Sequence, residues 1–114
     1  MLKKYNRLAK TKEIDRVFKE GGSAFCKHLG VKHLRNDLGF SRFATVVSAK
    51  VSKKAVYRNK IKRRIREIIK QELPTLKAGE DIIIITLPEI RNCSYIDIKK
   101  ILTQEFRKSS LYKS

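Results

Sequence analysis

The sequence lacks the long apolar segments that form transmembrane helices. It contains 114 residues with no tryptophan, two prolines and two cysteines, and its longest apolar run covers only residues 82–85. A helix that spans a bilayer needs about 18 or more apolar residues, so a transmembrane helix is excluded. Export is not expected either, because Asn6, Arg7 and Lys10 lie where a signal peptide needs its apolar core. We therefore expect a cytoplasmic protein.

Residues for protein-based catalysis are also scarce. His28 and His33 are five residues apart on a predicted strand, which places them on opposite faces and prevents an acid–base pair. Together with Cys26 and Cys93 they show neither the C-x₂-C nor the H-x₃-H spacing of zinc sites. There is no carboxylate cluster among the basic residues and no glycine-rich phosphate loop. The sequence predicts no catalytic residue and no metal site in the protein, and the cysteines are interpreted as reduced, buried thiols.

Acidic residues are few compared with basic ones. The chain has 28 Lys and Arg against 11 Asp and Glu, a net charge of +17. Between Asp37 and Glu67 there is no acid, whereas ten basic residues occur, nine of them within residues 50–66. Such self-repulsion does not help a fold, so the excess indicates a polyanionic partner, either nucleic acid or an anionic membrane surface. A chain of this length forms one domain with its own core, which we predict over residues 1–114.

Hydrophobic periodicity predicts an α+β domain, a small sheet packed by helices in the order α-β-β-α-β-α. The expected helices cover about residues 11–20, 54–73 and a last segment from Ser94, and the expected strands cover about residues 24–34, 42–48 and 81–87. Thr11 is the expected N-cap of the first helix, and Ser94 with Asp97 resembles a capping box. The second strand is expected to pair with the first in an antiparallel manner.

The helix over residues 54–73 has two contrasting faces. One is an apolar stripe, formed by Tyr57, Ile61, Ile65, Ile68 and Ile69. Burial of each such side chain contributes about 1.5–3 kcal/mol, so this stripe is expected to enter the core. A second face, centred about 130° away, carries the polar and basic residues Arg58, Asn59, Lys62, Arg63, Arg66 and Lys70. Steps of four residues place cations about 6 Å apart, a spacing that suits successive phosphates of a nucleic-acid strand.

The basic face of this helix allows three interpretations. A merely solvated face is disfavoured, because like charges four residues apart cost about 0.2–0.5 kcal/mol per pair. A membrane-surface helix is disfavoured because the adjacent strands need the apolar stripe to cover them. Docking onto the phosphates of a nucleic acid is favoured. Asn59 leaves two alternatives open: tolerance near the helix start, or a bond from its amide to a 2′-hydroxyl, a phosphate or a metal-bound water.

Residues 58–67, with Ala55 upstream, resemble the RNR signature (A-x-x-RN-x-x-KR-x-x-RE) of the bacterial ribonuclease P protein component. The opening Arg7-Leu8, the strand over residues 46–50, the isoleucine run and the final Phe106-Arg107-Lys108 also resemble that family. The resemblance implies a noncatalytic protein that binds a large catalytic RNA and the 5′ leader of precursor tRNA. It also implies an endonucleolytic holoenzyme that uses Mg²⁺ through its RNA, and a fold with a left-handed βαβ crossover, against the usual rule.

The resemblance assigns two groups of site residues. The RNA-binding group is Lys50, Lys53, Lys54, Arg58, Asn59, Lys60, Lys62, Arg63 and Arg66, and the leader cleft contains Phe18, Ile14 and Ser48. The chain departs from the family where Ile14 replaces a common Phe, where Lys32 aligns with a common aromatic residue, and where one cation before the basic helix is missing. These departures affect the leader-stacking surface more than the basic helix. The alternative function is a ribosomal or general RNA-binding protein without a processing role.

Overall fold

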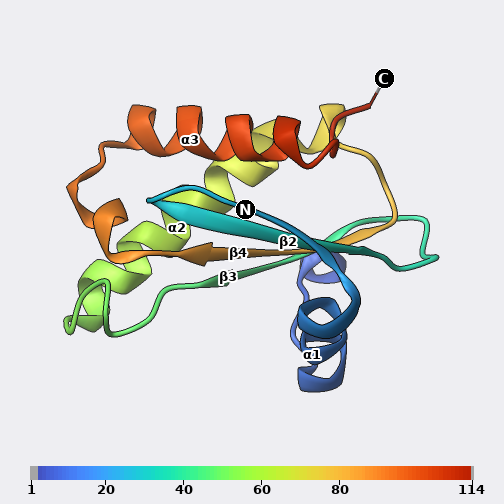
Figure 1. Cartoon of the computed structure of the whole chain (residues 1–114), viewed down its shortest axis with the longest axis horizontal. Helices are drawn as coiled ribbons and strands as arrows, with labels where there is room; N and C mark the ends of the chain where they lie inside the picture. Colours follow the sequence, from blue (N-terminus) through green and yellow to red (C-terminus); the bar gives the residue numbers. More distant parts are fainter. Residues whose placement is uncertain (1–2, 114) are drawn as a thin grey trace.

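A computed structural model describes residues 3–113, and the predicted domain of residues 1–114 also includes Met1, Leu2 and Ser114, which lie outside the described part. The chain forms one four-stranded sheet packed by three α-helices, which confirms the predicted α+β class (Figure 1). The α-helices and strands, in chain order, are α1 (Thr11–Glu20), β1 (Gly22–Phe25), β2 (Leu29–Arg35), β3 (Arg42–Val46), α2 (Ala55–Glu72), β4 (Glu80–Thr86) and α3 (Tyr95–Lys108). Short 3₁₀ turns cover Lys4–Asn6, Leu73–Thr75 and Pro88–Asn92.

The sheet differs from the predicted strand pairing in two respects. The single strand predicted over residues 24–34 is a hairpin of β1 and β2, closed by the amide of Cys26, which donates to the carbonyl of Leu29 at 2.9 Å. The strand order is β1-β2-β4-β3, so β3 pairs in parallel with β4 and not with β2. The reason is burial: β4 is covered on both faces and takes an interior position. The β3-α2-β4 unit has the parallel arrangement that the resemblance implies, and its left-handed crossover stays a prediction.

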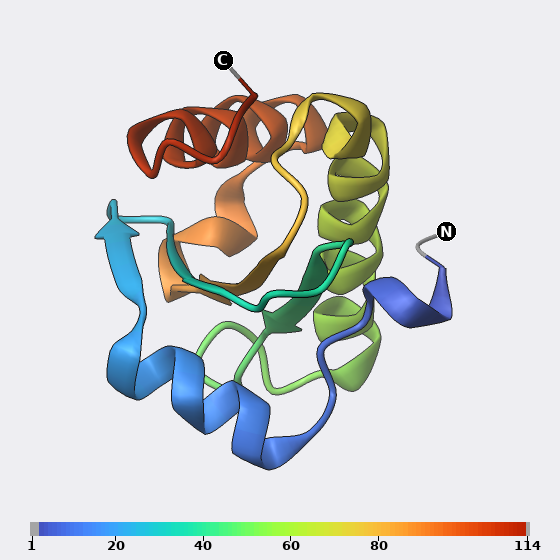
Figure 2. The same ribbon diagram turned by 90° about the vertical axis from the view of Figure 1, so that its right-hand side faces the viewer.

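The helices cover the two faces of the sheet unequally. Figures 1 and 2 show α3 on one side of the sheet and α1 on the other, with α2 running along the side that carries β3. Alternate residues of β4 serve the two sides: Ile82 and Ile84 belong to the main core with α2 and α3, whereas Ile83 packs with Val17 of α1 and Leu8. In Figure 1, α1 lies under one end of the sheet only. The other end of that face has no helix over it.

The helix starts agree only partly with the predictions. In α1 the N-cap is Lys10 and not Thr11, and no side chain caps the helix. The capping box of α3 is confirmed, because the Asp97 amide donates to the Ser94 hydroxyl at 3.2 Å and the Ser94 amide donates to the Asp97 carboxylate at 3.1 Å. Cys26 and Cys93 are free thiols, half-buried and not fully buried as predicted. Among the described helices, none has the length and apolar character that crossing a membrane requires.

Candidate nucleic-acid interface

The residues of α2 divide between the core and solvent. Ile61, Ile65, Ile68 and Ile69 are buried, as the apolar stripe predicts. Tyr57 was assigned to the same stripe, and that assignment is wrong, because this residue is 52% exposed. The buried residues of α2 begin at Ile61, so the first turn of the helix lies outside the core. The stripe therefore anchors α2 from its second turn onward.

The polar face of α2 forms an open basic groove. The groove has a volume of about 510 Å³ and is lined by Val56, Asn59, Lys62, Arg63 and Arg66. Throughout residues 3–113, the five ion pairs involve other residues, so no carboxylate lies within 4.0 Å of a basic side chain of α2. The cations of the groove are thus available to an external anion and are held on a rigid helix. We call this surface the basic groove.

Arg58 differs from the other basic residues of α2. Its guanidinium Nη1 donates to the carbonyl oxygens of Ser52 and Lys53, both at 2.9 Å, and the residue is half-buried. It therefore holds the segment between β3 and α2, which carries the exposed Lys50, Lys53 and Lys54. These two bonds give Arg58 a structural contact although it lies outside the apolar stripe.

Lys60 does not line the basic groove. At about 100° per residue it lies about 100° around the helix from the middle of the groove, on the flank that also carries Arg64. Lys60 is exposed and Arg64 is half-buried. Of the predicted residues on α2, the structure groups Asn59, Lys62, Arg63 and Arg66, and separates Arg58 and Lys60 from them.

A second groove adjoins the basic groove through Arg66, which lines both. It has a volume of about 320 Å³ and lies between β3 and the amino-terminal part of the chain; its lining residues are Arg7, Leu8, Ala9, Ile14, Phe43, Ala44, Thr45, Val46 and Arg66. Ile14, one of the residues predicted for the leader cleft, lines this groove. Phe18 is 42% exposed and lies toward β2, with Nζ of Lys32 at 5.6 Å from the centroid of its ring.

Ser48 is not among the residues that line the second groove. Its hydroxyl accepts from the amide of Lys50 at 3.3 Å, and its carbonyl accepts from the amide of Val51 at 3.0 Å. The structure thus gives Ser48 a turn-forming contact after β3. The three residues predicted for the leader cleft therefore do not form one cluster.

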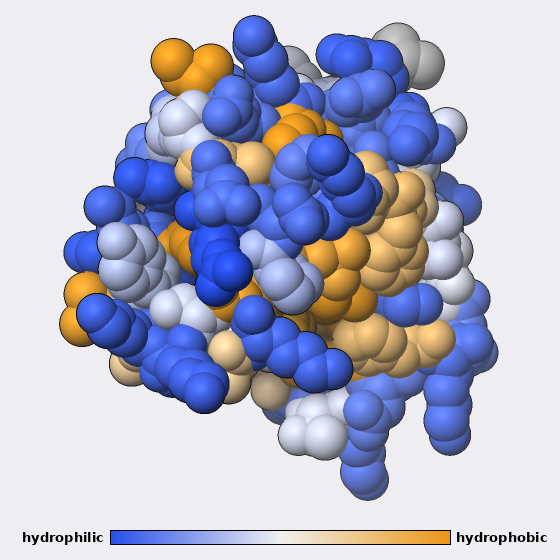
Figure 3. Space-filling model, turned by 60° about the vertical axis from the view of Figure 1, so that its left-hand side comes forward, coloured by the Kyte–Doolittle hydropathy of each residue, from blue (hydrophilic) through white to orange (hydrophobic). Residues whose placement is uncertain are grey.

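The sequence interpretation missed an exposed apolar surface on the part of the sheet that α1 leaves uncovered. Phe25 is 47% exposed and Val46 is 39% exposed. Figure 3 shows apolar side chains gathered in one patch with hydrophilic side chains around it. The sequence predicted one continuous strand here and no hairpin. The pairing of Phe25 with Gly30 depends on the turn between β1 and β2, so the prediction did not include this surface.

The thiols and carboxylates of the protein do not assemble into a reactive centre. Among residues 3–113, no three His, Cys, Asp or Glu side chains are grouped so as to hold a metal ion. Desolvation by burial, followed by the nearby Asp97, raises the pKa of the Cys93 thiol and disfavours the thiolate that a nucleophile needs. The chemistry that the basic groove supports is binding of a polyanion.

Sequence comparison relates the whole chain to one family. The profile of the family described as Ribonuclease P matches residues 2–110. The chain is 34% identical over 108 residues to the ribonuclease P protein component of Syntrophus aciditrophicus, covering 91% of this chain and 90% of that protein. It is 37% identical over 116 residues to the ribonuclease P protein component of Bacillus velezensis, covering 98% of this chain and 96% of that protein.

Structural comparison gives the same result. The RNase P protein of Staphylococcus aureus superposes with a TM-score of 0.88 at 28% identity, covering 95% of this chain and 98% of that one. The RNase P protein of Thermotoga maritima superposes with a TM-score of 0.79 at 28% identity, covering 89% of this chain and 96% of that one. The similarity therefore includes the sheet, its helices and their order along the chain.

Proposed function

The chain belongs to the ribonuclease P protein family, and on that premise we propose how its surfaces act. Membership makes it a protein subunit of the ribonuclease P endoribonuclease, a ribonucleoprotein that processes the 5′ end of tRNA. Nothing in the similarities supports the alternative of a ribosomal or general RNA-binding protein. The proposals concern which RNA each surface binds and what the protein contributes to cleavage.

The basic groove binds the backbone of the catalytic RNA. The observation that carries this proposal is the set of cations on α2 without ion-pair partners in the described part of the chain, above all Lys62, Arg63 and Arg66. Arg is suited to bidentate binding of phosphate, and Lys acts as a point charge. Because Ile61, Ile65 and the following isoleucines fix α2 in the core, the cations are ordered before RNA arrives.

The second groove and the open end of the sheet bind the single-stranded leader of precursor tRNA. Arg66 lines both grooves, so the leader and the catalytic RNA can lie side by side with its positive charge between them. The apolar residues on this side, including Ile14 and Val46, suit unpaired bases. The net charge of +17 offsets repulsion between the two RNA molecules.

The protein is inactive without the catalytic RNA. Hydrolysis at a phosphodiester needs an acid–base pair or metal ions held by carboxylates, and the described residues offer no group of three metal ligands. The side chains present therefore do not fit a resident Mg²⁺ ion. We assign Mg²⁺ to RNA phosphates, and the protein holds no metal ion for the cleavage.

Reconstitution tests this function. Cleavage of precursor tRNA is measured over a Mg²⁺ series with protein alone, with a bacterial ribonuclease P RNA alone, and with both. We expect cleavage with both at a lower Mg²⁺ concentration than with RNA alone, and none with the protein alone. The protein-alone arm includes an mRNA, because one solved Staphylococcus aureus RNase P protein is a mutant with defective mRNA degradation activity. Cleavage by the protein alone, or no effect of the protein on the RNA, contradicts the proposal.

A matched pair of variants locates the RNA contact. The triple variant Lys62→Ala, Arg63→Ala and Arg66→Ala removes three positive charges from the basic groove. The control Lys77→Ala, Lys100→Ala and Arg107→Ala removes three positive charges from exposed sites elsewhere. Equal losses of RNA affinity would show a nonspecific charge effect and contradict the groove. We expect a much greater loss for the first variant, because only its charges face one rigid site.

A further inference from the structure

The ring of Phe25 occupies the space that a side chain at position 30 would fill. Phe25 of β1 is paired with Gly30 of β2. A β-carbon added at Gly30 would lie 2.1 Å from Cε2, 2.2 Å from Cδ2 and 2.6 Å from Cζ of this ring. Of the described glycines, Gly79 alone has a positive φ, so the backbone at Gly30 accepts any L residue. Glycine is required at position 30 by the ring and not by the chain conformation.

This pair lies on the uncovered end of the sheet. The strand register aligns Phe25, Gly30, Ile85 and Val46 across all four strands, and paired residues point to the same face. That face is the one that carries Ile83 and α1, whose helix covers only the neighbouring rows. Phe25 stays 47% exposed although one side of its ring lies on the backbone of Gly30. An exposed aromatic residue in an apolar patch is typical of a binding surface.

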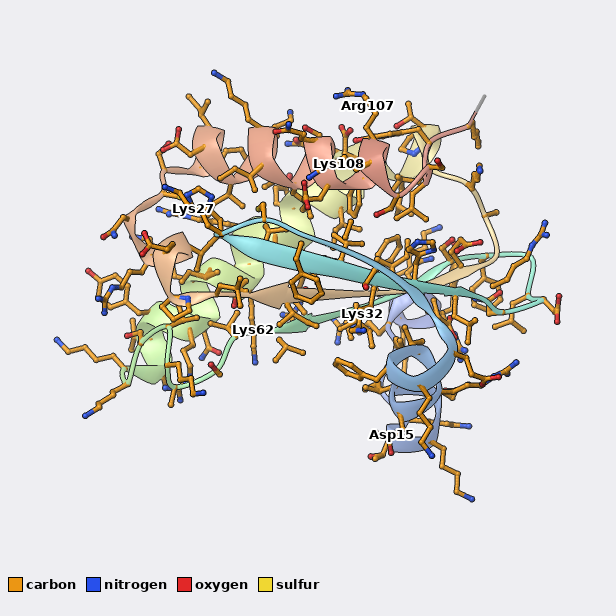
Figure 4. The ribbon with its side chains drawn as sticks, viewed as in Figure 1. Asp15, Lys27, Lys32, Lys62, Arg107 and Lys108 are labelled. Carbon is orange, nitrogen blue, oxygen red and sulfur yellow. The ribbon has the colours of Figure 1, made fainter. Side chains whose placement is uncertain are left out.

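The charges around the patch select RNA as its occupant. Lys32 is two residues from Gly30 on the same strand and face, and Figure 4 shows it between the sheet and α1. Lys27 lies in the turn that follows Phe25, and Arg66 lines the groove beside Val46. A flat apolar ring bordered by cations matches a single-stranded nucleic acid, whose bases stack while its phosphates bind Lys and Arg.

We propose that Phe25 is a stacking platform for one unpaired nucleobase of the precursor-tRNA leader, and that Gly30 is the positioning residue that seats its ring on the sheet. The proposal rests on the proposed function and deepens it, because it names the contact that holds the leader.

The test measures binding of precursor tRNA to the reconstituted holoenzyme. The proteins are the wild type, Phe25→Ala, Phe25→Leu, Phe25→Trp and Gly30→Ala. The substrates carry an intact leader or a leader with one abasic nucleotide, moved through each position in turn. For the intact leader we expect Phe25→Ala and Phe25→Leu to weaken binding about 5- to 150-fold, the range of one base–aromatic stack. Phe25→Trp keeps a ring and is expected to bind within about threefold of wild type.

Gly30→Ala keeps the ring but displaces it, so we expect a loss close to that of Phe25→Ala. In the Phe25→Ala background, Gly30→Ala should add no further loss, since there is no ring left to displace. At one leader position, the abasic nucleotide should weaken binding to the wild type and leave binding to Phe25→Ala unchanged. A merely structural role of Phe25 does not produce that position-specific result.

Two outcomes overturn the inference. One is binding of the intact leader by Phe25→Leu within about twofold of wild type. The other is an equal loss for Phe25→Ala at every abasic position, which assigns the effect to folding. Both are distinguishable from failure of the proposed function, in which the wild-type protein itself does not assist the catalytic RNA. Phe25→Leu and Phe25→Trp keep the test valid if Phe25→Ala does not fold.

Discussion

Arg42 binds the carboxylate of Asp81 through two hydrogen bonds, from Nε at 2.8 Å and from Nη2 at 2.6 Å. The remaining Nη1 donates to Glu13 of α1 at 2.7 Å. The hydrogen bond to Asp81 is the largest cause of a raised pKa at Arg42. These contacts join α1 to strands β3 and β4, beside the groove that contains Ile14. The position of α1, and with it one wall of the second groove, depends on this ion-pair network.

Replacing Arg42 with Ala is expected to lower the free energy of unfolding by about 3–5 kcal/mol, because it leaves the nearly buried Asp81 carboxylate without its partner. The matched control is Arg16→Ala, which removes an exposed pair with Glu20 and should cost at most about 0.5 kcal/mol. Urea unfolding of both variants measures the difference. Similar losses for the two would show that the network is not a specific anchor of α1.

The capping box of α3 predicts a pH dependence. The backbone and hydroxyl hydrogen bonds of Ser94 lower the pKa of Asp97 below its ordinary value of 3.8. A lowered folded-state pKa means that the ionised carboxylate stabilises the protein above about pH 4, and that this contribution is lost as the pH falls through the folded-state value. Asp97→Ala should therefore be less stable than wild type at neutral pH, with a smaller difference near pH 3. A difference that is independent of pH would contradict this assignment.

The two ends of the apolar stripe on α2 should respond differently to truncation. Ile65 is completely buried, so Ile65→Ala is expected to cost about 2–5 kcal/mol of unfolding free energy. Tyr57 is 52% exposed, so Tyr57→Ala should change stability by no more than about 0.5 kcal/mol. Thermal and urea unfolding of the two variants check this. A large loss of unfolding free energy for Tyr57→Ala would show that this residue is part of the core, as the periodicity predicts.

The outcome for Tyr57 shows how far a helical pattern can be trusted. Spacing identifies which face of α2 is apolar, and it locates the buried isoleucines correctly. It does not show at which residues the helix packs in the core and at which it does not. The buried residues of α2 begin at Ile61, and Tyr57 in its first turn faces solvent. That information depends on the path of the chain between β3 and α2.

Strand pairing shows a similar limit. Alternation and β-branched residues identify β3 and β4 as strands, but partners depend on distant parts of the chain. The turn between β1 and β2, residues 26–28, contains no Gly or Pro, so the sequence gives only a weak signal for this hairpin. The stacking of Phe25 on Gly30 follows from that hairpin. Of the candidate site, the cation-bearing face of α2 was therefore predictable, whereas the apolar end of the sheet was not.

Arg63 and Arg58 allow the roles of binding and folding to be separated on one helix. Arg63 is exposed in the basic groove without an ion pair in residues 3–113, so Arg63→Ala should leave the unfolding free energy within about 0.5 kcal/mol of wild type. If it contacts one phosphate of the catalytic RNA, the slope of log affinity against log salt concentration should fall by about 0.7–0.9.

Arg58→Ala also removes the hydrogen bonds to the carbonyls of Ser52 and Lys53, so it should lower the unfolding free energy by about 1–3 kcal/mol. Salt titrations of RNA binding and urea unfolding of both variants provide the measurements. An unchanged salt slope for Arg63→Ala would remove this side chain from the RNA contact, and unchanged stability for Arg58→Ala would deny it the structural role.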